Sequence, residues 1–273
     1  MTQDIAELLK ETCYRVFNRT RGLIGTDSGN EEFGVGAGGD ISRKIDLEAE
    51  AAIFEVLKEH SFRPTIIAEE AGMIEGPDGY LVIDAVDGTT NASRGIPFFC
   101  CSIAYATGIT LSSVQAAAVI DLSNRDLYHA KHRSGSYKNN RTIQVNNSIT
   151  NLESDEIGDI ILGLNLSNAD PASVTRLLKA FSASKHIRHF GANALELCYL
   201  ASGLLDAYID IRGKIRITDV AAAYLVVKEA GGKLYGTDGL ELDSTLTSRE
   251  RISFVAVSDD KLFSHLASIF VGV

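Results

Sequence analysis

The sequence predicts a mixed α+β fold in which helices cover β-sheets. Segments with helical and with strand character alternate along all 273 residues, and the chain has no internal repeat. Hydrophobic residues make up 45% of the chain and charged residues 23%, which provides enough apolar side chains for a large core. At roughly 150 residues per domain, this length favours two domains or one large α/β unit.

Helices are predicted where apolar residues recur every three or four positions. Segments with this spacing cover residues 4–17, 46–60, 173–182, 193–202, 219–230 and 259–270. Glycines follow two of these segments, at Gly203 and at Gly231-Gly232, as is common at helix ends. Ser258 is placed to cap the last helix.

Strands are predicted where short runs rich in β-branched and apolar residues are bounded by polar residues or glycine. Such runs cover 65–68, 80–83, 102–107, 114–121, 157–166, 186–190, 204–211 and 252–257. Two stretches between them are interpreted as connections, a glycine-rich loop over 25–40 and a polar surface segment over 131–141. The polar residues 140–153 are the best boundary candidate, between an N-terminal α+β domain (1–148) and a C-terminal α/β domain (149–273).

The charges and cysteines exclude several classes of protein. The chain carries 26 basic and 36 acidic residues, a net charge of −10, which argues against a nucleic-acid partner. Its four cysteines lack the paired spacing of zinc sites and are interpreted as buried free thiols in a reducing compartment. The first residues do not resemble a signal peptide, and no run reaches the ~18 apolar residues of a membrane span. We therefore expect a cytoplasmic protein without a membrane partner.

An acidic motif follows the apolar run 80–83. Asp84 and Asp87 come first, and Gly88-Thr89-Thr90 can then open a helix whose free N–H groups suit a phosphate. A strand end places side chains in the crevice where open sheets bind ligands. Two carboxylates there repel each other unless a cation lies between them, and oxygen ligands favour Mg²⁺, Mn²⁺ or Ca²⁺ over zinc. A simple turn or helix-capping role for Asp87 is an equal alternative.

Other polar residues also have a structural interpretation beside a functional one. Glu69 follows the run 65–68, so it is a candidate for the same cation cluster or part of a solvated loop. Asp219 begins a predicted helix, where aspartate is a common N-cap. The cations near predicted helix starts suit either a phosphate or surface salt bridges, and they are Arg188, Arg212, Lys214 and Arg216.

The glycines of residues 34–39 match the spacing of a dinucleotide-binding motif, G-x-G-x-x-G. That motif needs a strand before it and a helix directly after it, and the polar residues 26–32 do not predict such a strand. We therefore interpret 34–39 as a flexible loop. A nicotinamide-dependent oxidoreductase is a distant alternative that rests on this loop alone.

Taken together, four segments resemble motifs of the inositol monophosphatase superfamily of metal-dependent, lithium-sensitive phosphatases. The resemblance extends in order and spacing from about residue 5 to the end of the chain. The matching segments are A-E-E-A-G at 68–72 for the family's G-E-E-S/G, D-A-V-D-G-T at 84–89 for D-P-I-D-G-T, T-D-V-A-A at 218–222 for W-D-x-A-A/G, and a fourth pattern from 191–198 to 228–232.

Two positions depart from the family's pattern. Ala85 replaces the proline between the acids, which loosens the turn, and Thr218 replaces a tryptophan, which removes an aromatic wall and no ligand. The resemblance implies the five-layer α-β-α-β-α sandwich of the sugar phosphatases, with the site between its two halves. It also implies a homodimer.

By position, the resemblance implies a centre with two or three Mg²⁺ ions, with Mn²⁺ as an alternative cation. Glu69, Asp84 and the backbone carbonyl of Val86 would hold the first ion. Asp84, Asp87 and Asp219 would hold the second. Most of these ligands belong to the N-terminal domain, whereas Asp219 belongs to the C-terminal one.

The resemblance also implies the remaining catalytic groups. Asp46 matches the acid that orients the attacking water together with the threonine at Thr89, so Asp46, Glu69 and Thr89 are the implied catalytic residues. The cations would acidify the water for in-line attack on phosphorus and stabilise the leaving oxygen. Gly88, Thr89 and Thr90 would donate hydrogen bonds to the phosphate oxygens.

Within the superfamily, the chain looks most like the archaeal-type dual fructose-1,6-bisphosphatases/inositol monophosphatases, because it is short and lacks the insertions of nucleotide-specific members. In that subgroup, arginines that match Arg188 and Arg212 contact the sugar phosphate, and Asp210 is placed to accept hydrogen bonds from sugar hydroxyls. Fructose 1,6-bisphosphate and inositol 1-phosphate are therefore the expected substrates. The implied substrate contacts are Asp87, Gly88, Thr89, Thr90, Arg188, Gly191, Ala192, Asn193, Asp210 and Arg212.

Two further alternatives stay open. The substrate could be a nucleotide phosphate such as NADP or phosphoadenosine phosphate, hydrolysed by the same mechanism. A non-catalytic binding protein is the weaker alternative, since a scaffold has no physical need for a cluster of mutually repelling acids.

Overall fold

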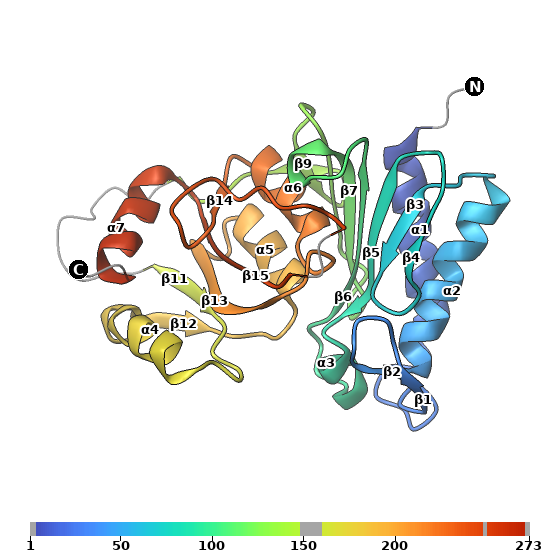
Figure 1. The fold of residues 1–273 in the computed structure, drawn as a ribbon, viewed down its shortest axis with the longest axis horizontal. Coiled ribbons are helices and arrows are strands. Elements are labelled where there is room, and N and C mark those ends of the chain that lie inside the picture. The colour runs from blue at the N-terminus through green and yellow to red at the C-terminus, as the bar shows by residue number, and fades with distance from the viewer. Residues whose placement is uncertain (1–3, 148–159, 248–249, 271–273) are drawn as a thin grey trace.

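The computed structural model describes residues 4–147, 160–247 and 250–270. Its elements form five layers, α-β-α-β-α, as predicted (Figure 1). From right to left in Figure 1, these are two N-terminal helices, a large sheet, two central helices, a smaller sheet and two outer helices. The layered arrangement accounts for the alternation of helix and strand patterns along the sequence.

The large sheet contains eight strands in the order β10-β9-β8-β7-β6-β5-β3-β4. Neighbouring strands are antiparallel except β3 and β5, which run parallel and therefore end at the same edge. The strands are β3 (Thr65–Ala68), β4 (Gly72–Ile74), β5 (Tyr80–Asp87), β6 (Cys100–Ala106), β7 (Val114–Asp121), β8 (Leu127–Lys131), β9 (Ser136–Lys138) and β10 (Arg141–Ile143), with a short 3-10 helix η1 (Leu111–Ser113) before β7.

Two long helices, α1 (Ile5–Thr20) and α2 (Lys44–Glu59), cover one face of this sheet (Figure 1). Their apolar stripes are buried against it, with Cys13 of α1 and Ile53 of α2 fully enclosed. Side chains of β5 and β6 complete this core. The packing of α2 matters for the site, because it fixes the first turn of α2 beside the end of β5.

The central layer consists of α5 (Asn193–Ala201) and α6 (Ala221–Glu229), which lie between the two sheets. Both helices are apolar on almost all sides, as expected of helices enclosed by sheets. The second sheet has the order β12-β11-β13-β15-β14, and α4 (Pro171–Ala183) and α7 (Asp260–Phe270) cover its outer face. Its strands are β11 (Ile161–Leu164), β12 (His186–Arg188), β13 (Ala207–Ile215), β14 (Lys233–Tyr235) and β15 (Ile252–Val257).

The structure corrects the predicted loop over residues 25–40. Part of it is strand β1 (Glu32–Val35), which pairs with β2 (Ile41–Arg43) as a short hairpin ahead of α2. All four residues of β1 are exposed. The segment therefore lacks the alternation of buried and exposed residues by which a strand is predicted from sequence. Because β2 and not a helix follows the glycines of 34–39, the dinucleotide motif is absent, and the oxidoreductase alternative loses its support.

Three smaller predictions are also corrected. Strand β5 does not end at Ile83 but continues to Asp87, because its backbone stays paired with β6 where the side chains become acidic. The predicted connection 131–141 contains strand β9. Asp259, and not Ser258, caps α7, since the Leu262 amide donates to Asp259 Oδ1 at 2.8 Å.

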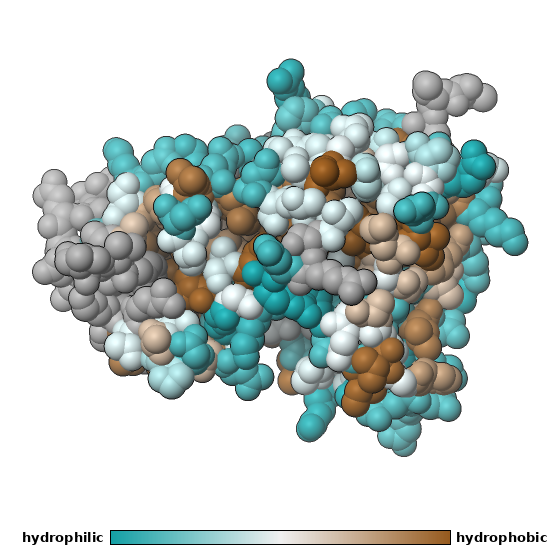
Figure 2. All heavy atoms as spheres, in the orientation of Figure 1, coloured by the Kyte–Doolittle hydropathy of each residue, from teal (hydrophilic) through white to brown (hydrophobic). Residues whose placement is uncertain are grey.

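Hydrophobic side chains also reach the surface at one end of the molecule. Figure 2 shows them gathered at the lower right, over β1 and β2, where Phe33, Val35 and Ile41 are each more than half exposed. Among the residues that the structure describes, no helix has the length and apolar character needed to span a bilayer. The proposed boundary at 148/149 lies outside the described residues.

Candidate active site

A cavity of about 480 Å³ opens where the end of β5 meets the central helices and the β1–β2 hairpin. The structure brings most of the predicted site residues to its wall. The lining residues are Asp40, Ile41, Arg43, Asp46, Glu69, Glu70, Asp84, Val86, Asp87, Gly88, Thr89, Thr90, Gly191, Asn193, Arg216 and Asp219. A larger hollow of about 690 Å³ lies along α1, but its acids are paired with cations, as in Lys10–Glu7 and Arg15–Glu11.

Pairing of β3 with β5 brings two of the acids together. Ala68, the last residue of β3, lies opposite Ile83 of the parallel strand β5, so the next residues of the two segments, Glu69 and Asp84, lie side by side. Asp219 approaches from the turn between β13 and α6. Carboxylate oxygens of Glu69, Asp84 and Asp219 all lie within 4.8 Å of one another.

A bulge in β5 turns the fourth acid toward the same cavity. Asp84 pairs with Ser102 and Asp87 with Cys100, so β5 has one residue more than β6 between these positions. In a regular strand, residues three positions apart lie on opposite faces of the sheet, and the bulge lets Asp84 and Asp87 point to the same one. The Ala194 amide of α5 then donates a hydrogen bond to Asp87 Oδ2 at 2.6 Å.

Asp219 does not cap a helix, so the alternative interpretation of this residue as an N-cap is wrong. Helix α6 begins after Val220, which makes no side-chain cap. The Asp219 carboxylate instead accepts hydrogen bonds from the Arg216 amide at 3.1 Å and from Thr218 Oγ1 at 3.2 Å. Its chain neighbours therefore hold it toward the acid cluster.

Burial raises the pKa of every acid in this cluster. It is the main cause for Asp84, Asp87 and Asp219, whose pKa values all lie above the usual range. Repulsion by neighbouring acids adds to the rise for Asp84 and Asp87, whereas Arg216 opposes it for Asp219. The pKa of Glu69 rises to about 7 for the same reasons, against the opposing effect of Arg216. A buried set of converging carboxylates offers oxygen ligands only, which suits a hard divalent cation. A bound cation would offset both the cost of burying the negative charges and the repulsion between them.

Asp46 and Thr89 form a second polar group at the cavity wall. Asp46 lies in the first turn of α2, where its Oδ2 accepts from the Arg43 amide at 2.9 Å. Thr89 Oγ1 lies 3.2 Å from Asp46 Oδ1 and 3.0 Å from the Val86 carbonyl oxygen. Burial raises the pKa of Asp46 to about 7. The pair can orient a water molecule beside the acid cluster.

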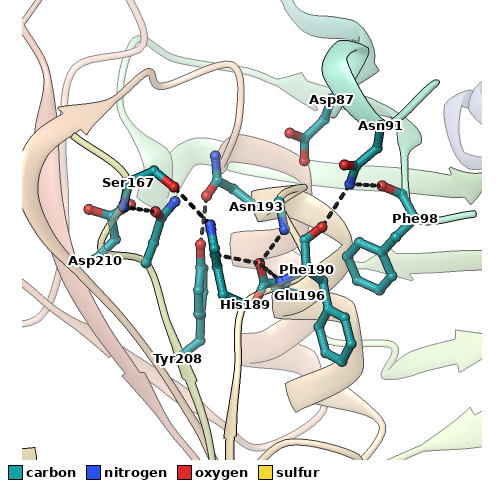
Figure 3. Close-up of polar contacts among 12 residues, drawn as sticks. Asp87, Asn91, Phe98, Ser167, His189, Phe190, Asn193, Glu196, Tyr208 and Asp210 are labelled. Atoms are coloured by element: carbon teal, nitrogen blue, oxygen red, sulfur yellow. Dashed lines mark hydrogen bonds and ion pairs between the residues drawn. The ribbon is translucent and has the colours of Figure 1, made fainter. Parts of the chain in front are cut away.

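The predicted phosphate-binding residues begin a short helix, α3 (Thr89–Arg94). Gly88 precedes it with φ 91°, and a Cβ atom there would lie 3.2 Å from the Gly191 carbonyl oxygen. Glycine is therefore required both by the left-handed backbone and by the close approach of the two chain segments. Asn91 strengthens this approach by donating from Nδ2 to the Phe98 and Phe190 carbonyls, both at 2.7 Å (Figure 3).

Four predicted substrate contacts lie outside the cavity lining. Arg212 is ion-paired with Asp210 and donates from Nη1 to the Ser167 carbonyl at 2.6 Å. Arg188 is exposed and donates to the Ile187 carbonyl at 2.9 Å, whereas Ala192 is fully buried. In the view of Figure 3, Asp210 lies beside Ser167, and Asn193 lies between this pair and Asp87. All four predicted contacts belong to the C-terminal half of the chain.

Sequence reasoning missed the role of Arg216 and of the loop before β2. The Arg216 guanidinium forms ion pairs with Glu69 and with Asp40, and thus enters the acid cluster. Ser42 likewise donates to Glu70 at the cavity wall. The available signals were the position of Arg216, three residues before Asp219, and the acid within the glycine-rich loop.

Comparisons with known proteins agree with this geometry. The family model described as the inositol monophosphatase family matches residues 2–269. The chain belongs to the inositol monophosphatase family. This family is metal-dependent, and the cluster of Glu69, Asp84 and Asp219 provides this member with a suitable group of ligands.

Individual inositol monophosphatase relatives differ in the activity that they are named for. A fructose-1,6-bisphosphatase/inositol-1-monophosphatase of Methanothermobacter thermautotrophicus is 36% identical over 252 residues, with 88% of this chain and 87% of that protein covered. A bifunctional NADP phosphatase/NAD kinase of Methanococcus maripaludis is 28% identical over 98% of this chain, which spans 49% of that protein. A solved Pyrococcus horikoshii protein with similarities to inositol-1 monophosphatase superposes with a TM-score of 0.80 at 26% identity, with 99% and 98% of the chains covered.

Proposed function

We propose that this chain is a Mg²⁺-dependent phosphomonoesterase that hydrolyses fructose 1,6-bisphosphate and inositol 1-phosphate. One observation carries the proposal. The carboxylates of Glu69, Asp84 and Asp219 converge within 4.8 Å in the same cavity as the Asp46–Thr89 pair. Cation ligands and a water-orienting group side by side are what phosphate ester hydrolysis requires.

Five residues would hold the cations. Glu69, Asp84 and the Val86 carbonyl would bind one ion, and Asp84, Asp87 and Asp219 a second, with Mn²⁺ as an alternative to Mg²⁺. When bound, the cations lower the pKa of the attacking water and neutralise charge on the phosphate and leaving oxygen. The donor set consists of oxygen atoms only, as Mg²⁺ prefers.

The chain's own residues orient the reactants. Asp46, once ionised, accepts a hydrogen bond from the attacking water, and Thr89 Oγ1 fixes that carboxylate. The amides of Gly88, Thr89 and Thr90 at the start of α3 face the cavity and are placed to donate to phosphate oxygens.

The substrate is a small phosphorylated sugar or cyclitol. The similarity to the Methanothermobacter bisphosphatase/monophosphatase supports this, as does the polar border formed by Asp210, Arg212 and Ser167 beyond Asn193. Similarity to the bifunctional NADP phosphatase/NAD kinase favours NADP as the second candidate. We further propose a homodimer, and two domains that meet at residues 148/149.

The first test is release of inorganic phosphate from fructose 1,6-bisphosphate, inositol 1-phosphate, NADP and phosphoadenosine phosphate, with Mg²⁺ and with EDTA. We expect Mg²⁺-dependent release that favours the fructose and inositol esters and stops in EDTA. Release mainly from a nucleotide would retain the mechanism and replace the substrate. No release from any of the four by folded protein, with Mg²⁺ or Mn²⁺, would contradict the proposal.

Arg188 and Arg212 should favour hydrolysis of the bisphosphate over that of the monophosphate. Replacing Arg188 or Arg212 with alanine is expected to lower kcat/KM for fructose 1,6-bisphosphate about tenfold, because a cation near the second phosphate is lost, and to change inositol 1-phosphate hydrolysis little. Lys214→Ala is the matched control, since this exposed cation lies two residues from Arg212. If the ratio of the kcat/KM values for the two substrates were unchanged, these arginines would not bind the second phosphate.

A further inference from the structure

Arg216 is the cation in closest contact with the acid cluster. Its residue lies just after β13, and its side chain crosses the cavity to Glu69, which follows β3 in the N-terminal half of the chain. Seven acids line the cavity, and the other basic residue on its wall is Arg43. A guanidinium in such a place supplies positive charge that a bound divalent cation would otherwise supply.

One guanidinium serves several partners at once. Nη1 contacts Glu69, while Nη2 contacts Asp40 and lies 3.4 Å from the Gly38 carbonyl oxygen. Asp40 is exposed and belongs to the loop between β1 and β2, so the guanidinium could leave Glu69 without losing all of its partners. The arginine also has a buried Nε with no hydrogen-bond partner among the described residues.

The same residue holds a second ligand through its backbone. The Arg216 amide donates to Asp219 Oδ2 at 3.1 Å. This backbone contact orients a carboxylate toward the cluster whatever the side chain does. The side chain, in contrast, contacts a carboxylate oxygen of Glu69, which is itself a candidate cation ligand. Backbone and side chain therefore have opposite effects on the binding of a cation.

We propose that Arg216 is a built-in counter-ion of the acid cluster, which a divalent cation must displace from Glu69 to bind fully. This inference rests on the proposed cation-dependent function and deepens it. In the absence of metal, Arg216 compensates the buried carboxylates and keeps Glu69 in place. When a divalent cation arrives, Glu69 exchanges the guanidinium for the ion, and Arg216 keeps Asp40 and the Gly38 carbonyl. Arg216 thus weakens cation binding while it stabilises the metal-free protein.

Calorimetric titration with Mn²⁺ and with Mg²⁺ tests the exchange directly. In Arg216→Gln, the dissociation constant should fall at least about tenfold, because repulsion by a unit charge a few ångströms away is lost. Arg216→Lys keeps the charge and should stay within about threefold of the wild type. Arg43→Gln is the matched control: it removes a positive charge from the same cavity wall without a contact to Glu69, and its effect should be clearly smaller.

Thermal unfolding measures the second expected effect of Arg216→Gln, a loss of stability in the absence of metal. In EDTA at pH 8, Arg216→Gln should unfold several degrees below the wild type, since its acids have lost their counter-ion. Saturating Mg²⁺ should raise its unfolding temperature by more than it raises that of the wild type, because tighter binding stabilises more. A role for Arg216 in positioning alone would lower stability with and without the ion.

The exchange can also be followed by NMR in the wild-type chain. The Nε–Hε resonance of Arg216, assigned by its absence from the spectrum of Arg216→Lys or by neighbouring resonances, should shift during a Mg²⁺ titration with the calorimetric midpoint. Binding of the ion without this shift, or equal or weaker binding by Arg216→Gln, would overturn the counter-ion role and leave the phosphatase proposal standing. Absence of any Mg²⁺ or Mn²⁺ binding by the wild type would overturn both.

Discussion

Replacing Asp84 with asparagine is expected to reduce phosphate release at least about 1,000-fold. Asp84 is 3% exposed and is the acid assigned to both cations, so its loss removes a ligand from each. An amide oxygen carries no charge and cannot restore the electrostatic part of binding. Calorimetry should show that Mg²⁺ binding is lost together with activity, which separates this effect from a loss of substrate binding.

The same substitution should stabilise the metal-free protein. Burial and the neighbouring acids raise the pKa of Asp84 in the folded state, so this carboxyl increasingly opposes folding as the pH rises above its pKa in the unfolded chain. At pH 8 in EDTA, Asp84→Asn is therefore expected to unfold about 3 °C or more above the wild type. Asp126→Asn, at an acid ion-paired with Lys138 outside the cavity, is the control and should retain activity. An active, Mg²⁺-binding Asp84→Asn protein would refute the ligand assignment.

Loss of the Asp46 carboxylate should slow catalysis about 100- to 10,000-fold without weakening cation binding. The reason is that Asp46 orients the water and does not belong to the cation ligands. Its pKa of about 7 in the metal-free site reflects burial, and a nearby cation lowers the pKa by favouring the charged form. Since the ionised form accepts the water's hydrogen bond, kcat/KM should rise with pH through a midpoint below 7 and then level off.

Two variants check this assignment. Asp46→Asn should remove the acidic limb of the pH–rate profile as well as lower the rate, whereas a purely structural residue would leave the profile unchanged. Thr89→Val keeps the side-chain shape but loses the hydroxyl that contacts Asp46, and Thr89→Ser restores it. We expect Thr89→Ser to recover most of the activity that Thr89→Val loses. Equal activity of the two would argue against a role for the hydroxyl.

Many of the elements could be predicted from local patterns. Strand β7 was predicted over its observed residues, and α1, α2 and α5 within a few residues at each end, because their apolar side chains repeat at the period of the element. The hairpin of β1 and β2 could not be predicted in this way. Its residues are mostly exposed, and pairing between two short segments is what defines it.

The acids of the site could be found because motifs are local too. Glu69 directly follows a predicted strand, and Asp84 continues another. The sequence alone therefore indicates both acids as candidate cation ligands. Their convergence was only implied by resemblance. Arg216 shows the limit most clearly: its position three residues before Asp219 is a local signal, but its two ionic partners, Glu69 and Asp40, are far away in the chain.

By itself, the sequence determined most of the helices and the longer strands, and which acids follow or continue an apolar strand, because periodicity and turn chemistry act over a few residues. Only the tertiary structure decided which of these acids meet. The parallel pairing of β3 with β5 brings Glu69 beside Asp84, a bulge turns Asp87 to the same cavity, and the central layer brings Asp219 and Arg216 across from the other half. Sheet order and packing between layers depend on contacts distant in sequence, so a charged residue acquires its partners only when the layers assemble.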